Sequence, residues 1–391
     1  MLKDFFWWLL KENLVINHIY VDILPKVFTV PNKPIGLTCP IQDKDSLLKK
    51  ESKSACLFSI KGYTSGTTNK PMMVYRSLKS ILLEEYMIKS YLKKIGVPLS
   101  AKIAIFRGDK IVTSNSVYWK KMPFTNRLIL SSYQLSELTA INYLKELEKY
   151  KPNIIMAYPS SITLLAKYAL KLDWQPNWEL SGVLTSSETF TLDNQDIVRS
   201  VFGHVYDHYG QAERVAALQQ CELGNYHVRE DYSLVEFLPD EHGIRIVGTN
   251  IHNKAMPLKR YDTKDYVEGL NQKGDCKCGN TSPYVKRILG RDDDYVILSD
   301  GRQIGRLDVV FKEVINLIEC QLEQTLLNEV IVRYVPDKGA NISLLENSIE
   351  RGLRERLNDD IIILFQEVNE VPRTKAGKFR SVIRNKDIVS V

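Results

Sequence analysis

The chain has 391 residues, which is too long for one ordinary domain and predicts two or three packed units. Apolar residues make up 44% and charged residues 26% of it, a balance that excludes a disordered chain. The formal net charge of +6 is small for this length, and the lysines and arginines are spread along the chain. We therefore expect no nucleic-acid partner.

The N-terminal segment is aromatic, with Phe6 and Trp7 at its centre, and Lys11 and Glu12 interrupt it. So short an apolar run cannot span a bilayer, and no small-residue cleavage site follows it. A helix that packs on its own domain and a peripheral contact with a membrane surface or a partner both stay open. The absence of a secretory signal, together with only six cysteines, predicts a cytoplasmic protein with reduced thiols.

Helical and extended patterns alternate in the first half of the chain. Apolar residues at helical spacing predict three helices, over 75–95, 138–150 and 161–172. Short apolar runs predict three strands, over 102–107, 153–158 and 180–185. This alternation predicts an α/β region with parallel strands.

The pattern changes after about residue 225. Residues 235–237 and 244–247 predict antiparallel strands that a Gly-containing turn at 239–243 connects. Beyond a charged stretch near Asp293, helices are predicted near 308–325 and 343–357, with short strands between and after them. This compact tail predicts a separate small α+β domain.

The segment from Gly62 to Pro71 alternates glycines with hydroxyl side chains and ends in a lysine. Glycines let backbone N–H groups approach phosphate oxygens, hydroxyls add donors, and the lysine adds charge. The glycine spacing and Pro71 exclude a Walker loop. On its own the segment also fits a surface turn, and its candidate phosphate ligands are Thr64, Ser65, Gly66, Thr67, Thr68 and Lys70.

Three later segments have residues suited to a nucleotide. The ring of Tyr209, before Gly210, can stack on a purine, and Glu213 four residues on can hold Mg²⁺. Asp265 offers acceptors for ribose hydroxyls, and Lys378 lies on a Gly-containing loop near the C-terminus. Each alone has an ordinary alternative, a common turn before a helix or a solvated basic tail.

In this order and spacing, the four segments resemble the adenylate-forming superfamily of acyl-CoA synthetases, peptide-synthetase adenylation domains and luciferases. The resemblance runs from about residue 60 to 385. It is closest to the phenylacetate–CoA ligase-like branch that includes CapK-type capsular-polysaccharide proteins. The segments that indicate this branch are Tyr158–Ser161, Thr185–Thr189, Tyr209–Arg214 and Arg373–Arg380.

The resemblance implies a fold of two parts. A large N-terminal α/β region of two subdomains, residues 1–292, would bind ATP and the acyl group. A small mobile α+β domain, residues 293–391, would carry the catalytic lysine, with the hinge at Asp293. The N-terminal region before the phosphate loop is short for this branch.

The resemblance also implies roles for single residues. The segment from Thr64 to Lys70 would wrap the β- and γ-phosphates of ATP. Glu213 would bind Mg²⁺, and Lys378 would be the catalytic lysine. The nucleotide pocket would be completed by Ser187, Glu188, Tyr209 and Gly210 around the adenine and by Asp265 and Arg291 at the ribose. Asn69 and Lys264 depart from the family pattern, which has glycine at both positions.

The implied reaction joins a small-molecule carboxylate to ATP, giving an acyl-adenylate and pyrophosphate. The acyl group would then pass to a thiol, of CoA or a carrier protein, or to an amine, in capsular or other surface-polysaccharide biosynthesis. The carboxylate is itself the nucleophile, so no Ser/His/Asp or Cys/His set is required. The alternative is an inactive nucleotide-binding or scaffold protein of a polysaccharide assembly complex, which Lys264 and the short N-terminal region motivate.

A tight cysteine pair, Cys276 and Cys278, follows Cys221 and His227 along the chain. Three thiolates and an imidazole are the ligand set of a closed structural Zn²⁺ site, here within a subdomain at 221–280. Free thiols are the alternative. For the acyl pocket, Tyr133, Tyr158 and Ser160 are candidates, and His204 and His208 are expected to pack or to line a pocket rather than to catalyse.

Overall fold

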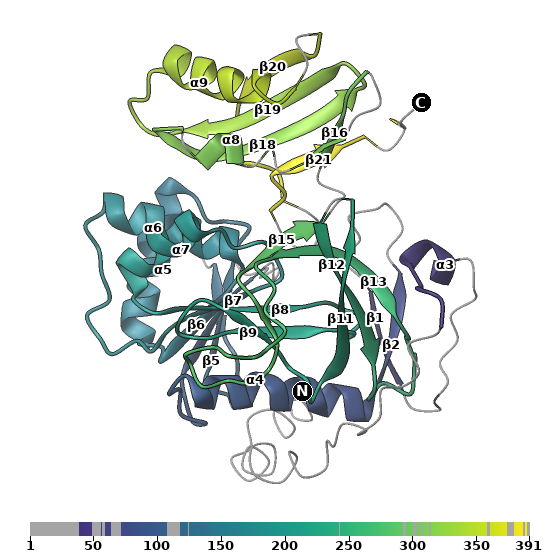
Figure 1. Cartoon of the computed structure of the whole chain (residues 1–391). Helices are drawn as coiled ribbons and strands as arrows, with labels where there is room; N and C mark the ends of the chain where they lie inside the picture. The colour runs from purple at the N-terminus through teal and green to yellow at the C-terminus, as the bar shows by residue number, and fades with distance from the viewer. Residues whose placement is uncertain are drawn as a thin grey trace.

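The computed structural model describes most of the chain from Cys39 onward (Figure 1). The described residues are 39–48, 56, 59–63, 72–107, 118–123, 125–241, 243–291, 295–299, 303–305, 307, 309–312, 314–357, 360–373, 379–385 and 388. The aromatic N-terminal segment, the predicted phosphate loop from Thr64 to Lys70, the predicted hinge at Asp293, and Lys378 lie outside them. No described helix is long and apolar enough to cross a membrane.

A nine-stranded sheet forms the centre of the described part of the chain, in the order β14-β10-β9-β8-β7-β6-β3-β5-β4. Its five neighbouring strands from β8 to β5 are parallel, as the sequence predicts. The strands are β3 (Ile103–Arg107), β4 (Trp119–Lys121), β5 (Arg127–Ser131), β6 (Ile154–Ala157), β7 (Gly182–Ser186), β8 (Val205–Gly210), β9 (Ala217–Gln220), β10 (Tyr226–Val228) and β14 (Tyr284–Val285).

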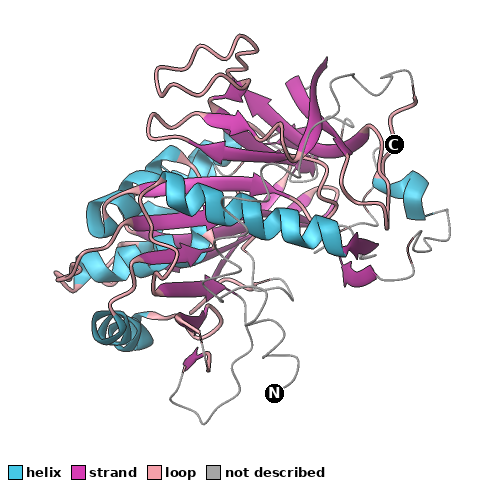
Figure 2. Ribbon diagram, turned by 90° about the horizontal axis from the view of Figure 1, so that it is seen from below, coloured by secondary structure: helices cyan, strands magenta, loops and turns pink. Residues whose placement is uncertain are grey.

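Helices cover both faces of this sheet. Along β3, Ala104 and Phe106 are fully buried and pack with α5 (Glu137–Tyr150), α6 (Pro159–Lys171) and α7 (Leu192–Phe202). Ile103 points to the other face and packs with α4 (Leu78–Lys94), which Figure 2 shows lying across the strands. The period of two along the strand therefore separates a helical layer on each side.

The predicted start of the first helix is three residues too early. Tyr75 to Ser77 belong to β2 (Met73–Ser77), which pairs with β1 (Ser59–Tyr63). The helix begins only after Ser77, whose hydroxyl accepts the Ser80 N–H at 3.3 Å and so caps the first turn. A short helix, α3 (Lys44–Leu48), precedes this hairpin.

A second, antiparallel sheet packs beside the first, in the order β11-β12-β13-β15. The predicted hairpin after residue 225 is its first strand pair. Its strands are β11 (Ser233–Asp240), β12 (Gly243–Asn250), β13 (Tyr261–Glu268) and β15 (Arg287–Arg291).

The C-terminal part of the chain forms a separate layer above the large sheets (Figure 1). Its sheet has the order β20-β19-β18-β21, and Leu345, Ile349 and Leu353 of α9 pack on it. Its elements are β16 (Tyr295–Ile297), β17 (Gln303–Gly305), α8 (Val309–Lys312), β18 (Leu317–Leu326), β19 (Glu329–Pro336), α9 (Ile342–Arg354), β20 (Ile362–Glu367) and β21 (Val382–Arg384). We call this layer the C-terminal unit.

The predicted helix near 308–325 is wrong over most of its length. Only α8, four residues long, is helical, and residues from Leu317 onward form the long strand β18. Ile318, Cys320 and Leu322 lie at alternate positions of the strand and enter the core of the C-terminal unit or its contact with the rest of the chain. Tertiary packing along this period of two overrides the weak helical spacing.

Candidate functional site

A cavity of about 920 Å³ opens at the carboxyl ends of the parallel strands, between α4, the large sheet and the C-terminal unit. The first parallel strand of the chain, β3, lies between the second and the third, β5 and β6. Such a reversal of strand order leaves a crevice at the strand ends, where α/β sheets bind their ligands. The volume is near the upper end of that of ligand pockets, about 300–1,000 Å³.

The predicted adenine and ribose residues meet in this cavity. The Tyr209 hydroxyl donates to Asp265 Oδ2 at 2.6 Å, and both side chains line the cavity. Tyr209 ends β8 and Asp265 lies on β13, so the bond joins the two large sheets. The backbone of Arg291 pairs with that of Asp265, so strand β15 lies beside β13 at this point.

The side chain of Lys264 lies near Asp262 rather than at the bond between Asp265 and Tyr209. Its backbone φ is +62°, a left-handed conformation that explains why glycine is usual there, and its side chain is half exposed. The ammonium group lies 3.8 Å from Asp262, while Asp265 accepts the bond from Tyr209. The departure from the family pattern costs backbone strain of about 1–2 kcal/mol and leaves the Asp265 carboxylate bonded to Tyr209.

Glu213 is buried on the wall of the same cavity. The Tyr261 hydroxyl donates to its Oε1 at 3.2 Å, and its other oxygen accepts no hydrogen bond from the described residues. A carboxylate oriented by one bond, with one oxygen left over, fits the requirement for a Mg²⁺ ligand.

Ser187 and Glu188 form a strained turn after β7. Ser187 has a backbone φ of +78°. Gly290 of β15 packs so close to Thr189 that a Cβ on Gly290 would lie 2.7 Å from Thr189 Oγ1. Ser187 and Glu188 both line the cavity, but the Glu188 carboxylate accepts two backbone N–H groups, from Ser160 and from Phe379, each at 2.9 Å.

A row of polar side chains crosses the strand ends on the α4 face, and Arg107 among them is not a site residue predicted from the sequence. Arg107 of β3 reaches past Tyr158, with its guanidinium carbon 5.8 Å from that ring, and donates to Ser186 Oγ of β7 at 3.1 Å. His208 of β8 pairs with Ser186 across the strands. Because the switch point lies between β3 and β6, Arg107 and Tyr158 sit where a ligand is expected. Tyr158 is among the residues that the sequence offers for the acyl pocket, whereas Arg107 has no sequence signal beyond its place at the end of a predicted strand.

Behind this row, the residues of β3 and β6 that line the cavity are apolar. Ile105 of β3 and Met156 of β6 are cross-strand neighbours, and each lies two residues before a member of the row, Arg107 or Tyr158. Ile88 and Leu92 of α4 also line the cavity. Of the candidate acyl residues, Tyr158 and Ser160 line this cavity, whereas Tyr133 lines a separate one of about 120 Å³.

Two buried neighbours on β8 have strongly shifted ionisation. Burial lowers the pKa of His208 to about 4, so its imidazole is uncharged at neutral pH. Burial raises the pKa of Asp207 to about 6, although Thr185 and Tyr226 donate hydrogen bonds to its carboxylate at 2.6 and 2.9 Å. His208 lines the cavity, as expected, while His204 stacks on Tyr206 at 6.3 Å.

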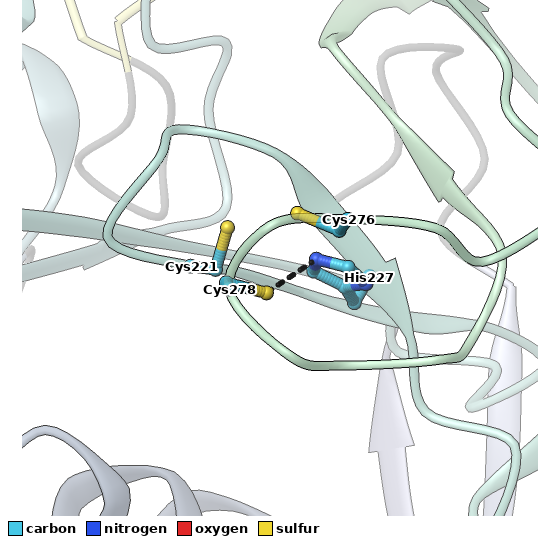
Figure 3. A group of neighbouring side chains, drawn as sticks. All are labelled: Cys221, His227, Cys276 and Cys278. Atoms are coloured by element: carbon cyan, nitrogen blue, oxygen red, sulfur yellow. Dashed lines mark hydrogen bonds between the residues drawn. The ribbon is translucent and has the colours of Figure 1, made fainter.

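The cysteine cluster forms away from the cavity (Figure 3). The ligand atoms of Cys221, His227, Cys276 and Cys278 all lie within 4.8 Å of one another, and Cys278 Sγ is 3.3 Å from His227 Nε2. His227 Nδ1 lies 3.2 Å from the Ser282 carbonyl, which fixes the tautomer that leaves Nε2 free for a metal. Zinc–sulfur bonds of about 2.3 Å require tetrahedral ligands about 3.8 Å apart, and this set fits.

Comparisons with known proteins agree with this architecture. The chain is 25% identical over 344 residues to protein CapK of Staphylococcus aureus, covering 83% of this chain and 74% of CapK. It is 23% identical over 274 residues to phenylacetate-coenzyme A ligase of Thermus thermophilus, and the match spans 61% of each chain.

The structure is similar to that of 2-hydroxyisobutyryl-CoA ligase in its postadenylation state, with a TM-score of 0.64 and 16% identity over 89% of this chain and 80% of the ligase. It is also similar to o-succinylbenzoate-CoA synthetase of Bacillus subtilis, with a TM-score of 0.51 and 15% identity over 84% of this chain and 68% of the synthetase. The chain therefore has the fold of the adenylate-forming CoA ligases. Within it, residues 296–385 match the family model of the CapK C-terminal domain. The predicted fold class and family resemblance are confirmed.

Two substitutions on β8 should change the pH dependence of stability in opposite directions. The raised pKa of Asp207 makes the folded state hold its proton more tightly, so this residue lowers stability as pH rises from about 4 to 6. The lowered pKa of His208 means that its imidazole binds a proton more tightly in the unfolded state. The contribution of His208 to stability therefore increases as the pH rises from about 4 to 6.5. In Asp207→Asn the contribution of His208 remains, so the free energy of unfolding should rise by about 3 kcal/mol over this pH range. In His208→Gln the contribution of Asp207 remains, and the free energy of unfolding should fall by a similar amount. Urea unfolding at several pH values measures both, and curves parallel to wild type would contradict the assignment.

Proposed function

We propose that this protein is an ATP-dependent, AMP-forming ligase that activates a carboxylic acid as its acyl-adenylate. The observation that carries the proposal is one cavity that contains Tyr209, Glu213 and Asp265 together with Phe379, the residue after Lys378. The likeness of the chain to CapK and to a phenylacetate-coenzyme A ligase supports the same reaction.

The chemistry requires charge compensation. A carboxylate that attacks the α-phosphorus of ATP brings two anions together, so cations at the phosphates lower the barrier. Glu213 would hold Mg²⁺, which neutralises phosphate charge when bound. Lys378 and Lys70 would supply further positive charge, and Tyr209 and Asp265 would hold the nucleoside through the ring and the ribose hydroxyls.

The acid would lie between the sheet and α4. On this proposal the Arg107 guanidinium orients the carboxylate at the strand ends, and the carbon body extends over Ile105 and Met156 toward Ile88. His208, uncharged at neutral pH, adds no competing positive charge. The acyl group would then pass to the thiol of CoA or of a carrier protein, or to an amine. A role in surface-polysaccharide assembly rests on the likeness to CapK.

We also propose that the four-residue cluster, formed by Cys221 after β9, His227 of β10 and the two cysteines of the 276–278 turn, holds structural Zn²⁺. The set supplies all four ligands of a tetrahedral ion, so no position is left for a substrate. The cluster ties the 276–278 turn to the edge of the large sheet.

Pyrophosphate release from ATP and Mg²⁺ across a panel of carboxylic acids tests the reaction. We expect release that depends on one class of acid and that falls by at least about 10²-fold in Lys378→Ala, because a cation at the reacting phosphate is lost. Lys338→Ala, on an exposed turn of the C-terminal unit, is a matched control that should retain the rate. No release with any acid, while ATP still binds, would favour the scaffold alternative.

Filling the apolar part of the cavity should narrow the range of acids. Ile105→Trp places a large ring where the carbon body of the acid would lie, so we expect at least a tenfold loss, roughly, for the bulkiest accepted acid and little change for the smallest. AMP binding should stay unchanged. Met156→Ala enlarges the same space and should have the opposite effect on acid size. Equal losses for all acids would place the acyl group elsewhere.

Removing a cluster ligand should release the metal without abolishing the chemistry. We expect about one zinc per chain in the wild type, its loss in Cys276→Ser, and a melting temperature lower by at least about 5 °C. Pyrophosphate release below that temperature should persist. Cys39→Ser, outside the cluster, should keep its metal. A wild-type protein without metal, purified under reducing conditions, would indicate free thiols.

A further inference from the structure

The two residues that flank segment 374–378 lie against each other on the C-terminal unit. The Arg373 guanidinium carbon is 4.9 Å from the centre of the Phe379 ring, and Arg373 also forms an ion pair with Glu319 of β18. Both side chains of this ion pair are largely buried. The start and the end of the segment that contains Lys378 are therefore held at one place.

The Glu188 carboxylate connects this place to the rest of the protein. Its Oε1 accepts the Phe379 N–H and its Oε2 accepts the Ser160 N–H in the first turn of α6, each at 2.9 Å. Burial raises the pKa of Glu188, and the two backbone N–H groups oppose that shift by stabilising the charged form. A carboxylate that accepts two backbone donors from two parts of the chain is a specific contact, not a general lining of a pocket.

We infer that Glu188 is the positioning residue that sets Lys378 for the adenylation step, by holding the Phe379 N–H against the large sheet. The inference rests on the proposed function, since it assigns Lys378 the catalytic role. Phe379 follows Lys378 directly in the sequence, so the bond to Glu188 anchors the described residue at the end of the segment that contains Lys378. A catalytic group displaced by about 1 Å can lose about 10²-fold in rate.

Within the described part of the chain, further polar contacts join the C-terminal unit to helix α6, whose first turn contains Ser160. Lys167 of α6 donates to the Ile318 carbonyl at 2.6 Å, and Lys171 at the end of α6 forms an ion pair with Asp337. These contacts attach the body of the C-terminal unit, whereas the Glu188 contact reaches Phe379, the residue that follows Lys378 in the sequence. Movement of the C-terminal unit for the second half-reaction must break it, so Glu188 acts in adenylation and not in acyl transfer.

Glu188→Ala and Glu188→Gln test this role, with Lys171→Ala as the matched control. Hydrogen–deuterium exchange of a peptide containing Phe379 reports the bond directly and needs no substrate. We expect exchange about 10- to 100-fold faster in Glu188→Ala, an intermediate value in Glu188→Gln, which keeps one acceptor oxygen, and wild-type exchange in Lys171→Ala. Unchanged exchange at Phe379 in both Glu188 variants overturns the inference.

The two half-reactions provide the second measurement. Pyrophosphate release should slow by a similar factor in Glu188→Ala with the KM for ATP within about twofold of wild type, and consumption of separately prepared acyl-adenylate should be unchanged. A raised KM for ATP with equal losses in both half-reactions would make Glu188 a nucleotide ligand instead and overturn the inference. If the wild type activates no acid, the proposed function fails, but the exchange measurement still decides whether Glu188 holds Phe379.

Discussion

The register of the parallel strands is the constraint on which the site depends. Because β3, β6, β7 and β8 run in the same direction with matched ends, their last residues meet along one edge. This alignment brings Arg107, Tyr158, Ser186 and His208 into one row, and the next row back is apolar. A single slip of one residue would turn each of these side chains to the opposite face of the sheet. The polar edge and the apolar floor of the cavity are therefore two consequences of one register.

Several carboxylates line the cavity, and three of them accept hydrogen bonds that fix their orientation. Asp265 accepts from Tyr209, Glu213 accepts from Tyr261, and Glu188 accepts from two backbone N–H groups. These bonds fix the position of negative charge before any ligand arrives, which lowers the reorganisation needed during a reaction. Two of these four bonds come from tyrosines, whose rings fill space while the hydroxyl group reaches the carboxylate. Arg76 stands near Glu213 on the same wall, and burial lowers the pKa of its guanidinium.

The sequence predicts the parallel α/β region, the antiparallel hairpin and the four members of the Cys/His cluster, because each depends on local periodicity or on residue type. It misassigns β18, where a pattern with apolar residues at several spacings is settled only by the core that α9 provides. Arg107 carries no local signal, since its role follows from strand order, a long-range property. The partner of Glu188 is equally invisible in the sequence, because Phe379 lies 191 residues further along the chain and contributes a backbone group rather than a side chain.

Helix α6 links the cavity to the docking of the C-terminal unit. Its first turn contributes Ser160 to the cavity wall, and its last two turns bind the C-terminal unit through Lys167 and Lys171. The apolar part of this contact is continuous with the core of the large domain, since Ile318 and Val335 pack in the same cluster as the residues of α6. Such a contact is bistable rather than elastic, because packed side chains separate as a unit. A ligand that alters the turn at Glu188 therefore acts on the same helix that holds the C-terminal unit in place, which gives a direct physical route from occupancy of the cavity to the arrangement of the two parts.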